Sequence, residues 1–171
     1  MFKLRTAAAL SFAFALATAG SAAAQDAAAG PRVASNTFFV ELGGNALVYS
    51  LNYERFFTPK LGVRVGGMYL RADDNAGTEL GVGLFPIMAT YLLGQGNSHF
   101  ETGAGIGIAT AGVDDTDVGE DWGDSAVYAT ATLGYRYQKP DGGVIFRAGF
   151  TPILGDGNLL PWVGLSVGYA F

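Results

Sequence analysis

The chain of 171 residues contains no cysteine and a single histidine, His99. The absence of cysteine excludes disulfide frameworks, thiolate metal sites and cysteine nucleophiles. Charged residues make up only 15% of the chain and the formal net charge is −5, so we expect no nucleic-acid partner. We also expect no cofactor. Although 50% of the residues are hydrophobic, no apolar run beyond the N-terminal segment is long enough for a membrane-spanning helix.

The N-terminal segment has the three parts of an export signal. Lys3 and Arg5 form a positive region, an apolar run follows, and alanines precede a predicted cleavage after Ala24. A membrane-anchoring helix is the alternative, but the run is short for a full span. The predicted parts of the chain are a signal peptide (1–24), a flexible leader (25–36) and one β-barrel domain (37–171).

The remainder of the chain alternates between apolar residues and small or polar residues with a period of two, which is typical of β-strands. Eight segments carry this pattern: 37–44, 47–57, 61–71, 79–93, 99–112, 125–139, 144–152 and 160–171. Pro86 lies where the alternation changes phase, so we expect a bulge there or a strand start above the bilayer. Short turns alternate with mostly longer loops, apart from a tight turn at Asn45. The sequence therefore predicts an all-β fold, an eight-stranded antiparallel up-and-down barrel.

The same alternation fits two barrels with opposite faces. A soluble, lipocalin-like barrel would place the bulky residues inside, where an eight-stranded interior is only just wide enough for side chains. The other face of each strand carries mainly Gly, Ser, Thr and Ala, which make a poor soluble surface. Aromatic residues near strand ends, such as Tyr69 and Tyr135, suit the girdles of a membrane barrel. We therefore predict a transmembrane barrel.

The last segment carries Leu165, Val167, Tyr169 and Phe171 on one face, with only small residues between them. This ending resembles the C-terminal strand of bacterial outer-membrane barrels, in which such a strand is the signal for the barrel assembly machinery. As a pattern, residues 37–171 are similar to the small eight-stranded barrels of the outer membrane protein A and X type and to opacity-type surface proteins.

The resemblance implies Sec-type export to the Gram-negative outer membrane, contact with outer-membrane lipid and lipopolysaccharide, and a monomer. It implies a structural or surface role in membrane integrity, adhesion or surface contact. The alternative is a narrow channel or a porin-like passive pore.

Six charged residues fall on the face of small residues, which becomes the lumen: Glu41, Glu54, Arg64, Glu101, Arg136 and Arg147. The turns place Glu54 opposite Arg64 and Arg136 opposite Arg147, with Glu101 near Arg136. Because buried charges must be paired, we expect two ionic clusters, one of Glu41, Glu54 and Arg64 and one of Glu101, Arg136 and Arg147. Their predicted role is structural plugging, which we favour over an ion pathway.

Two further features of the sequence could indicate a metal site or an enzyme active site, but the spacing of their residues argues against both. The acidic loop 113–124 lacks the spacing of an EF-hand, so we expect a solvated loop and no metal site. The alternative is loose binding of divalent ions among surface lipopolysaccharide. A lipid A-modifying enzyme would use a His and Ser pair at the surface, but Ser98 and His99 point to opposite faces of a strand. We therefore expect no enzyme, and an interfacial position for His99.

Overall fold

The computed structural model describes residues 33–73, 78–115 and 120–171, so the predicted signal peptide and most of the predicted leader lie outside the described residues. Ten strands and one turn of 3-10 helix occur in this part of the chain. Their bounds are β1 (Asn36–Gly43), η2 (Gly44–Ala46), β2 (Tyr49–Phe56), β3 (Leu61–Asp73), β4 (Thr78–Leu93), β5 (Ser98–Asp115), β6 (Glu120–Tyr137), β7 (Gly143–Phe150), β8 (Ile153–Gly155), β9 (Asn158–Leu160) and β10 (Val163–Ala170). No helix among these residues is long and apolar enough to cross a membrane.

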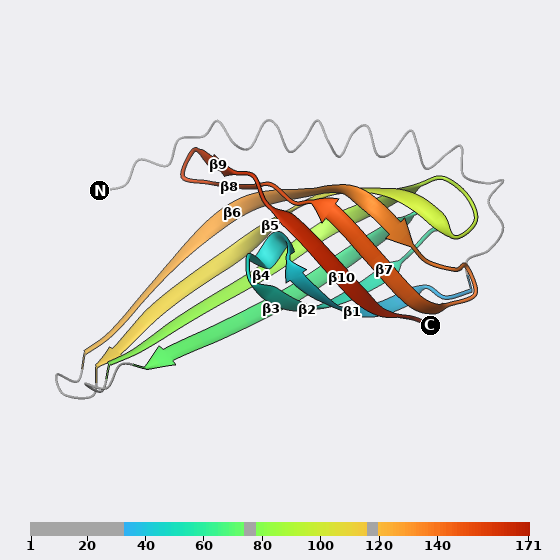
Figure 1. The fold of residues 1–171 in the computed structure, drawn as a ribbon. Coiled ribbons are helices and arrows are strands. Elements are labelled where there is room, and N and C mark those ends of the chain that lie inside the picture. The colour runs from blue at the N-terminus through green and yellow to red at the C-terminus, as the bar shows by residue number, and fades with distance from the viewer. Residues whose placement is uncertain (1–32, 74–77, 116–119) are drawn as a thin grey trace. The chain divides into compact units, whose positions relative to one another are not determined.

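The sheet closes on itself into a barrel (Figure 1). Its strand order is β5-β4-β3-β2-β1-β10-β7-β6, and a further pairing of β5 with β6 joins the two ends. Every pairing is antiparallel, and β1 meets β10 along its length, with Val40 opposite Val167. The predicted eight-stranded antiparallel barrel is therefore confirmed. The short strands β8 and β9 form a separate hairpin attached to β6.

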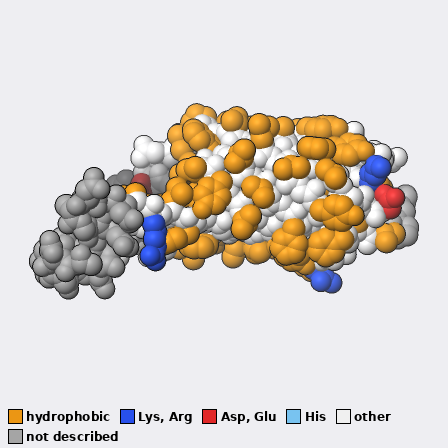
Figure 2. Space-filling model, turned by 60° about the horizontal axis from the view of Figure 1, so that its bottom comes forward, with side chains coloured by type: hydrophobic (Ala, Val, Ile, Leu, Met, Phe, Trp, Pro, Cys, Tyr) orange, Lys and Arg blue, Asp and Glu red, His pale blue; other side chains and the backbone are white. Residues whose placement is uncertain are grey.

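The apolar residues face outward. Phe38, Leu51 and Val167 are 57%, 67% and 51% exposed, whereas the alternate positions on the same strands are buried. Figure 2 shows hydrophobic side chains over the visible wall of the barrel, with charged side chains near its two ends. An apolar outer band around a polar interior is the arrangement of a transmembrane barrel and the reverse of a soluble one.

The barrel has a short wall and a tall wall. The short wall consists of β1, β2, β7 and β10, with eight residues each, and the tall wall consists of β3 to β6, with 13 to 18 residues each. We call the end with the short connections 57–60, 94–97 and 138–142 the turn end, and the opposite end the hairpin end. Short turns face the periplasm in bacterial outer-membrane barrels.

Three predicted boundaries differ from the structure. Strand residues extend into both segments that were predicted as loops. β3 and β4 cover 72–73 and 78 of the first segment, and β5 and β6 cover 113–115 and 120–124 of the second. These strand ends are mainly polar or small in sequence and carry no apolar alternation, so the pattern could not reveal them. Likewise, β8 and β9 occupy a region predicted to be mainly loop.

The expected bulge at Pro86 is wrong. The register of β4 with β5 runs unbroken from Leu84 to Met88, with Pro86 opposite Gly107. On the other side, the pairing of β4 with β3 is interrupted at Pro86 but resumes in the same register. The missing N–H of proline therefore removes part of a ladder without shifting it, and the apparent change of phase arises because inward positions such as Leu84 are also apolar.

The last residues of the predicted leader belong to the barrel structure. The leader was expected to extend to residue 36, but β1 starts at Asn36. The backbone N–H groups of Val33 and Ala34 donate to the carbonyl of Pro140 at 3.2 and 3.1 Å. Ala34 is buried with Ile145 and Ala170, so this segment packs against the turn end of the barrel.

Candidate functional site

All six predicted lumen charges lie inside the barrel. None is more than 6% exposed, and Glu54, Arg64 and Arg136 are fully buried. They come from six different strands: Glu41 from β1, Glu54 from β2, Arg64 from β3, Glu101 from β5, Arg136 from β6 and Arg147 from β7. Period-two alternation aims all of these side chains at the barrel axis.

Arg136 binds two carboxylates. Its Nη1 lies 2.5 Å from Oε2 of Glu54 and 3.3 Å from Oε2 of Glu101, and its Nε donates to Oε1 of Gln138 at 2.8 Å. The guanidinium carbon also lies 5.0 Å from the centre of the Phe56 ring. Arg136 is thus held by acceptors and by an aromatic face, as a buried cation requires.

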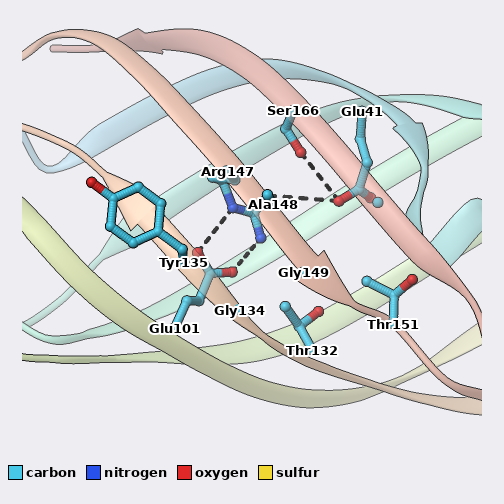
Figure 3. Close-up of a pocket in the computed structure, with 11 residues that line it drawn as sticks. Glu41, Glu101, Thr132, Gly134, Tyr135, Arg147, Ala148, Gly149, Thr151 and Ser166 are labelled. Atoms are coloured by element: carbon cyan, nitrogen blue, oxygen red, sulfur yellow. Dashed lines mark hydrogen bonds and ion pairs between the residues drawn. The ribbon is translucent and has the colours of Figure 1, made fainter.

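Arg147 lies between two further carboxylate contacts (Figure 3). Its Nε donates to Oε2 of Glu101 at 2.9 Å, and its Nη2 pairs with Oε1 of the same carboxylate. On the other side, its Nη1 lies 3.9 Å from Oε1 of Glu41, which also accepts from the Ser166 hydroxyl at 3.2 Å. The bidentate contact with Glu101 fixes the orientation of both groups.

Arg64 completes the arrangement. Its Nη1 lies 3.6 Å from Oε1 of Glu41, and its Nη2 donates to Oδ1 of Asn45 and contacts Sδ of Met88 at 2.9 Å. The contacts therefore run from Arg64 through Glu41, Arg147, Glu101 and Arg136 to Glu54 as one connected lumen network.

The structure corrects the predicted grouping into two clusters. Glu54 does lie opposite Arg64 in the register of β2 and β3, and Arg136 lies opposite Arg147. The ion pair of Glu54, however, is with Arg136 on β6. Turn geometry identifies which residues are neighbours along the wall. Long side chains in a narrow lumen also reach across it, and a strand register does not give the distance between opposite walls.

Asn45 was not among the predicted lumen residues, although its turn was noted as tight. The η2 turn folds into the barrel, and Gly44, Asn45 and Ala46 are all buried. The Asn45 side chain crosses to β6, where its Nδ2 donates to Oγ1 of Thr130 at 2.6 Å and to the carbonyl of Ala131 at 2.9 Å. The backbone carbonyl of Asn45 accepts from the Tyr128 hydroxyl at 2.9 Å.

Apolar layers lie on both sides of the lumen network. Towards the hairpin end, Ala46 packs with Met68, Leu84, Tyr128 and Ile153. Towards the turn end lies a second apolar cluster, composed of Ala34, Phe39, Ile145 and Ala170. The Phe39 ring joins this layer to the charges, because the Arg147 guanidinium lies 4.4 Å from its centre.

A small cavity remains beside Arg147 (Figure 3). Its volume is about 10 Å³, room for about one water molecule. Nη1 of Arg147 and the Thr151 hydroxyl have no hydrogen-bond partner among the described residues, and both residues line this cavity. The arrangement can hold a water molecule but leaves no space there for a solute.

Comparison with known proteins places this geometry in a fold. No family model matches the chain, and no curated protein sequence matches it. Among solved structures, the N-terminal β-barrel domain of Pseudomonas aeruginosa OprF superimposes with a TM-score of 0.59 at 17% identity, covering 82% of this chain and 98% of that one. The attachment invasion locus protein Ail of Yersinia pestis, in complex with the heparin analogue sucrose octasulfate, gives a TM-score of 0.56 at 14% identity, covering 81% and 97%.

The fold is that of a small eight-stranded outer-membrane barrel. The outward apolar band and this fold together indicate a Gram-negative outer-membrane location. The predicted resemblance is confirmed at the level of the fold.

His99 of this outer-membrane barrel is not the interfacial residue that was expected. It is 7% exposed and lies on the inner face, opposite Arg136 in the register of β5 and β6. The hydroxyl of Ser98 lies 3.0 Å from that of Tyr135, an exposed residue of the outer wall. Ser98 and His99 therefore point to opposite faces, as the alternation predicted, and do not form a hydrolytic pair.

Most side chains of the acidic segment 113–124 lie outside the described residues. The side chains of Asp114, Asp115, Asp117, Glu120 and Asp121 lie outside the described residues, so the expectation of a solvated loop without a metal remains a prediction. The backbone of the flanking residues continues as strand on both sides, with Asp114 opposite Asp121.

Proposed function

We propose that the chain is a structural and surface barrel of the outer membrane whose lumen is closed to ions and solutes. The observation that carries this proposal is the position of Asn45. Its side chain reaches Thr130 and Ala131 on the far side of the lumen, so the turn between β1 and β2 closes the barrel from within.

Closure is supported by more than one layer. A solute entering from the hairpin end would have to displace η2 and the apolar cluster around Met68 before reaching the lumen network. Moving the arginines apart from their carboxylates would then leave charges unpaired in a narrow interior, which costs several kcal/mol for each ion. Eight strands leave an interior that side chains fill.

The tall wall supports the surface part of the proposal. Strands β3 to β6 continue past the end of the short wall at the hairpin end, where they would meet lipopolysaccharide and the medium. The name of Ail, the attachment invasion locus protein, refers to attachment and invasion, and adhesion is the surface role that this wall would serve. A polyanion like the ligand of Ail is a poor match, because this chain has a formal net charge of −5.

The C-terminal strand is the feature that we assign to assembly by the barrel assembly machinery, and we propose that the assembled barrel is a monomer. Leu165, Val167, Tyr169 and Phe171 are all more than half exposed on the outer face of the barrel. In β10 they form a continuous apolar ridge separated by buried or half-buried small residues. We assign this ridge the role of assembly signal that the resemblance implies.

Conductance in a planar lipid bilayer tests closure. The refolded mature chain should show no discrete channel openings, and heat-modifiable migration on a gel should verify that the inserted protein is a folded barrel. Sustained unitary openings from such folded protein would contradict the proposal and favour the narrow channel. An assay on lipid A should yield no hydrolysis product, because Ser98 and His99 lie on opposite faces.

A further inference from the structure

A shallow apolar groove runs across the outer wall over β10, β1, β2 and β3. Two rows of outward side chains border it. The row nearer the turn end consists of Tyr169, Phe38, Tyr53 and Val65, and the row nearer the hairpin end consists of Val167, Val40 and Leu51. The Phe38 ring centre lies 4.9 Å from that of Tyr53, so the aromatic row is packed against itself.

A cationic residue lies one outward position beyond the row of the groove that is nearer the turn end. Arg55 is the next outward residue of β2 after Tyr53 and is exposed. Successive outward residues of a strand are about 7 Å apart, so the guanidinium can lie over the end of the groove. Its neighbours on the outer face are Tyr53, Asn36 and Val63, none of which is acidic. The Tyr53 hydroxyl donates to Oδ1 of Asn36 at 2.7 Å, so its proton is already engaged. Arg55 is therefore the donor that we assign to an anionic group at this end of the groove.

We propose that this groove binds an anionic phospholipid, with one acyl chain between the two apolar rows and the headgroup phosphate at Arg55. The charge selects the occupant, because a guanidinium forms paired hydrogen bonds with phosphate oxygens. The level in the membrane agrees, since Phe57 and Phe171 are exposed beside this end and mark the interfacial girdle. The turn end faces the periplasm, so the occupant comes from the periplasmic leaflet.

The chain offers a matched cation elsewhere at the same end. Lys139 is exposed in the connection after β6. It follows a strand that contributes no side chain to either row of the groove, whereas Arg55 is the next outward residue after Tyr53 in the row nearer the turn end. Lys139→Gln therefore removes the same charge as Arg55→Gln without touching the proposed site.

Native mass spectrometry of the full refolded chain in detergent, with added phosphatidylglycerol or phosphatidylcholine, tests the proposal. We expect one phosphatidylglycerol to be retained preferentially. Arg55→Gln should weaken its retention about five- to tenfold, the effect expected for one cation near an anionic headgroup, while Lys139→Gln should retain it like the wild type. Val40→Phe, which fills the groove with an apolar ring, should weaken retention of both lipids.

Equal retention of the two lipids, or equal retention by the wild type and Arg55→Gln, would overturn the site. A dimer mass that disappears in Val40→Phe would show a second copy in the groove and would also overturn it. The inference rests on the proposed membrane location but not on closure of the lumen. A barrel that conducts yet retains phosphatidylglycerol would contradict only the proposed function, and one that is silent without retention would contradict only the site.

Discussion

The two walls of the barrel differ in height, and the turn between β1 and β2 folds into the lumen where they differ. The short wall ends after eight residues per strand, and its connection at η2 turns inward instead of continuing outward. The tall wall continues past that level and supplies Thr130 and Ala131 as acceptors for the inward turn. A difference in strand length thus creates both the space for the plug and the surface to which it binds.

The lumen network also joins the two walls. Of its five ion pairs, three connect a residue of the short wall with one of the tall wall: Arg64 with Glu41, Arg136 with Glu54, and Arg147 with Glu101. Neighbouring strands already share backbone hydrogen bonds, so pairs across the lumen add contacts that the closed sheet does not provide. We expect the cross-wall pairs to determine how firmly the two walls are held together.

Removal of Arg136 should break this connection most severely. Arg136→Met leaves Glu54 and Glu101 without their shared cation, and an uncompensated buried charge costs about 3–5 kcal/mol. The unfolding midpoint in denaturant, measured in detergent micelles, should fall accordingly. Adding Glu54→Gln to this variant should recover part of the loss. A midpoint equal to that of the wild type would show that the network contributes little.

Arg64→Met should have a smaller effect of the same sign. Arg64 pairs with Glu41 and donates to Asn45, but Glu41 keeps a contact with Arg147 and a hydrogen bond from Ser166. Because no carboxylate is left alone, we expect a loss of about 1–3 kcal/mol, the range for a hydrogen bond to a charged group. The same denaturant titration checks it, and a loss exceeding that of Arg136→Met would reverse the order of importance inferred here.

The sequence predicts which residues of this site face the lumen and which are neighbours on adjacent strands, but it does not predict contacts across the lumen. Alternation along each strand correctly indicated that Glu41 and Arg147 face the lumen, because a period of two is a local property. Turn lengths correctly placed Glu54 opposite Arg64. The pairing of Glu54 with Arg136 could not be predicted in this way, because it depends on the barrel diameter and on side-chain reach.

The inward position of η2 (Gly44–Ala46), which we call the plug, was not predicted for a related reason. Asn45 lies in a turn, and turn sequences rich in Gly and Asn are usually exposed. The only local signal was that this outer connection was much tighter than the others. Its inward path requires positive φ values at Gly43 and Gly44, 70° and 72°, which are compatible with glycine but do not specify the direction of the turn. That direction follows from the unequal walls.

Asn45→Ala should weaken the plug selectively. The change removes the hydrogen bonds to Thr130 and Ala131 and also the Oδ1 acceptor of Arg64 and Thr132. Because each hydrogen bond has a net contribution of about 0.5–1.5 kcal/mol, the unfolding free energy should fall by at least about 2 kcal/mol. The change should also produce brief openings in a planar bilayer where the wild type shows none. Asn97→Ala, in an exposed turn at the opposite end, is the control and should change neither quantity. If both variants behave alike, η2 does not close the lumen.

The smallest expected effect concerns the β8–β9 hairpin, which extends from the short wall onto β6. Its turn holds Asp156 and Gly157 at φ values of 50° and 77°, and a Cβ added at Gly157 would meet open space. Gly157→Ala therefore adds only backbone strain, about 1–2 kcal/mol for a left-handed residue. Gly123→Ala, in the tall wall, also adds a methyl group to open space but requires no positive φ.

Hydrogen exchange separates these two variants. Amides of the β8–β9 hairpin should exchange roughly five- to thirtyfold faster in Gly157→Ala, because the strain lowers the free energy of local opening. They should be unchanged in Gly123→Ala, and the unfolding midpoint of the barrel should be the same in both. Such a result would show that the hairpin opens independently of the walls. A lowered midpoint in Gly157→Ala would instead show that the hairpin unfolds cooperatively with the barrel. The short wall would then be stabilised by the contact of the hairpin with β6 as well as by the lumen network.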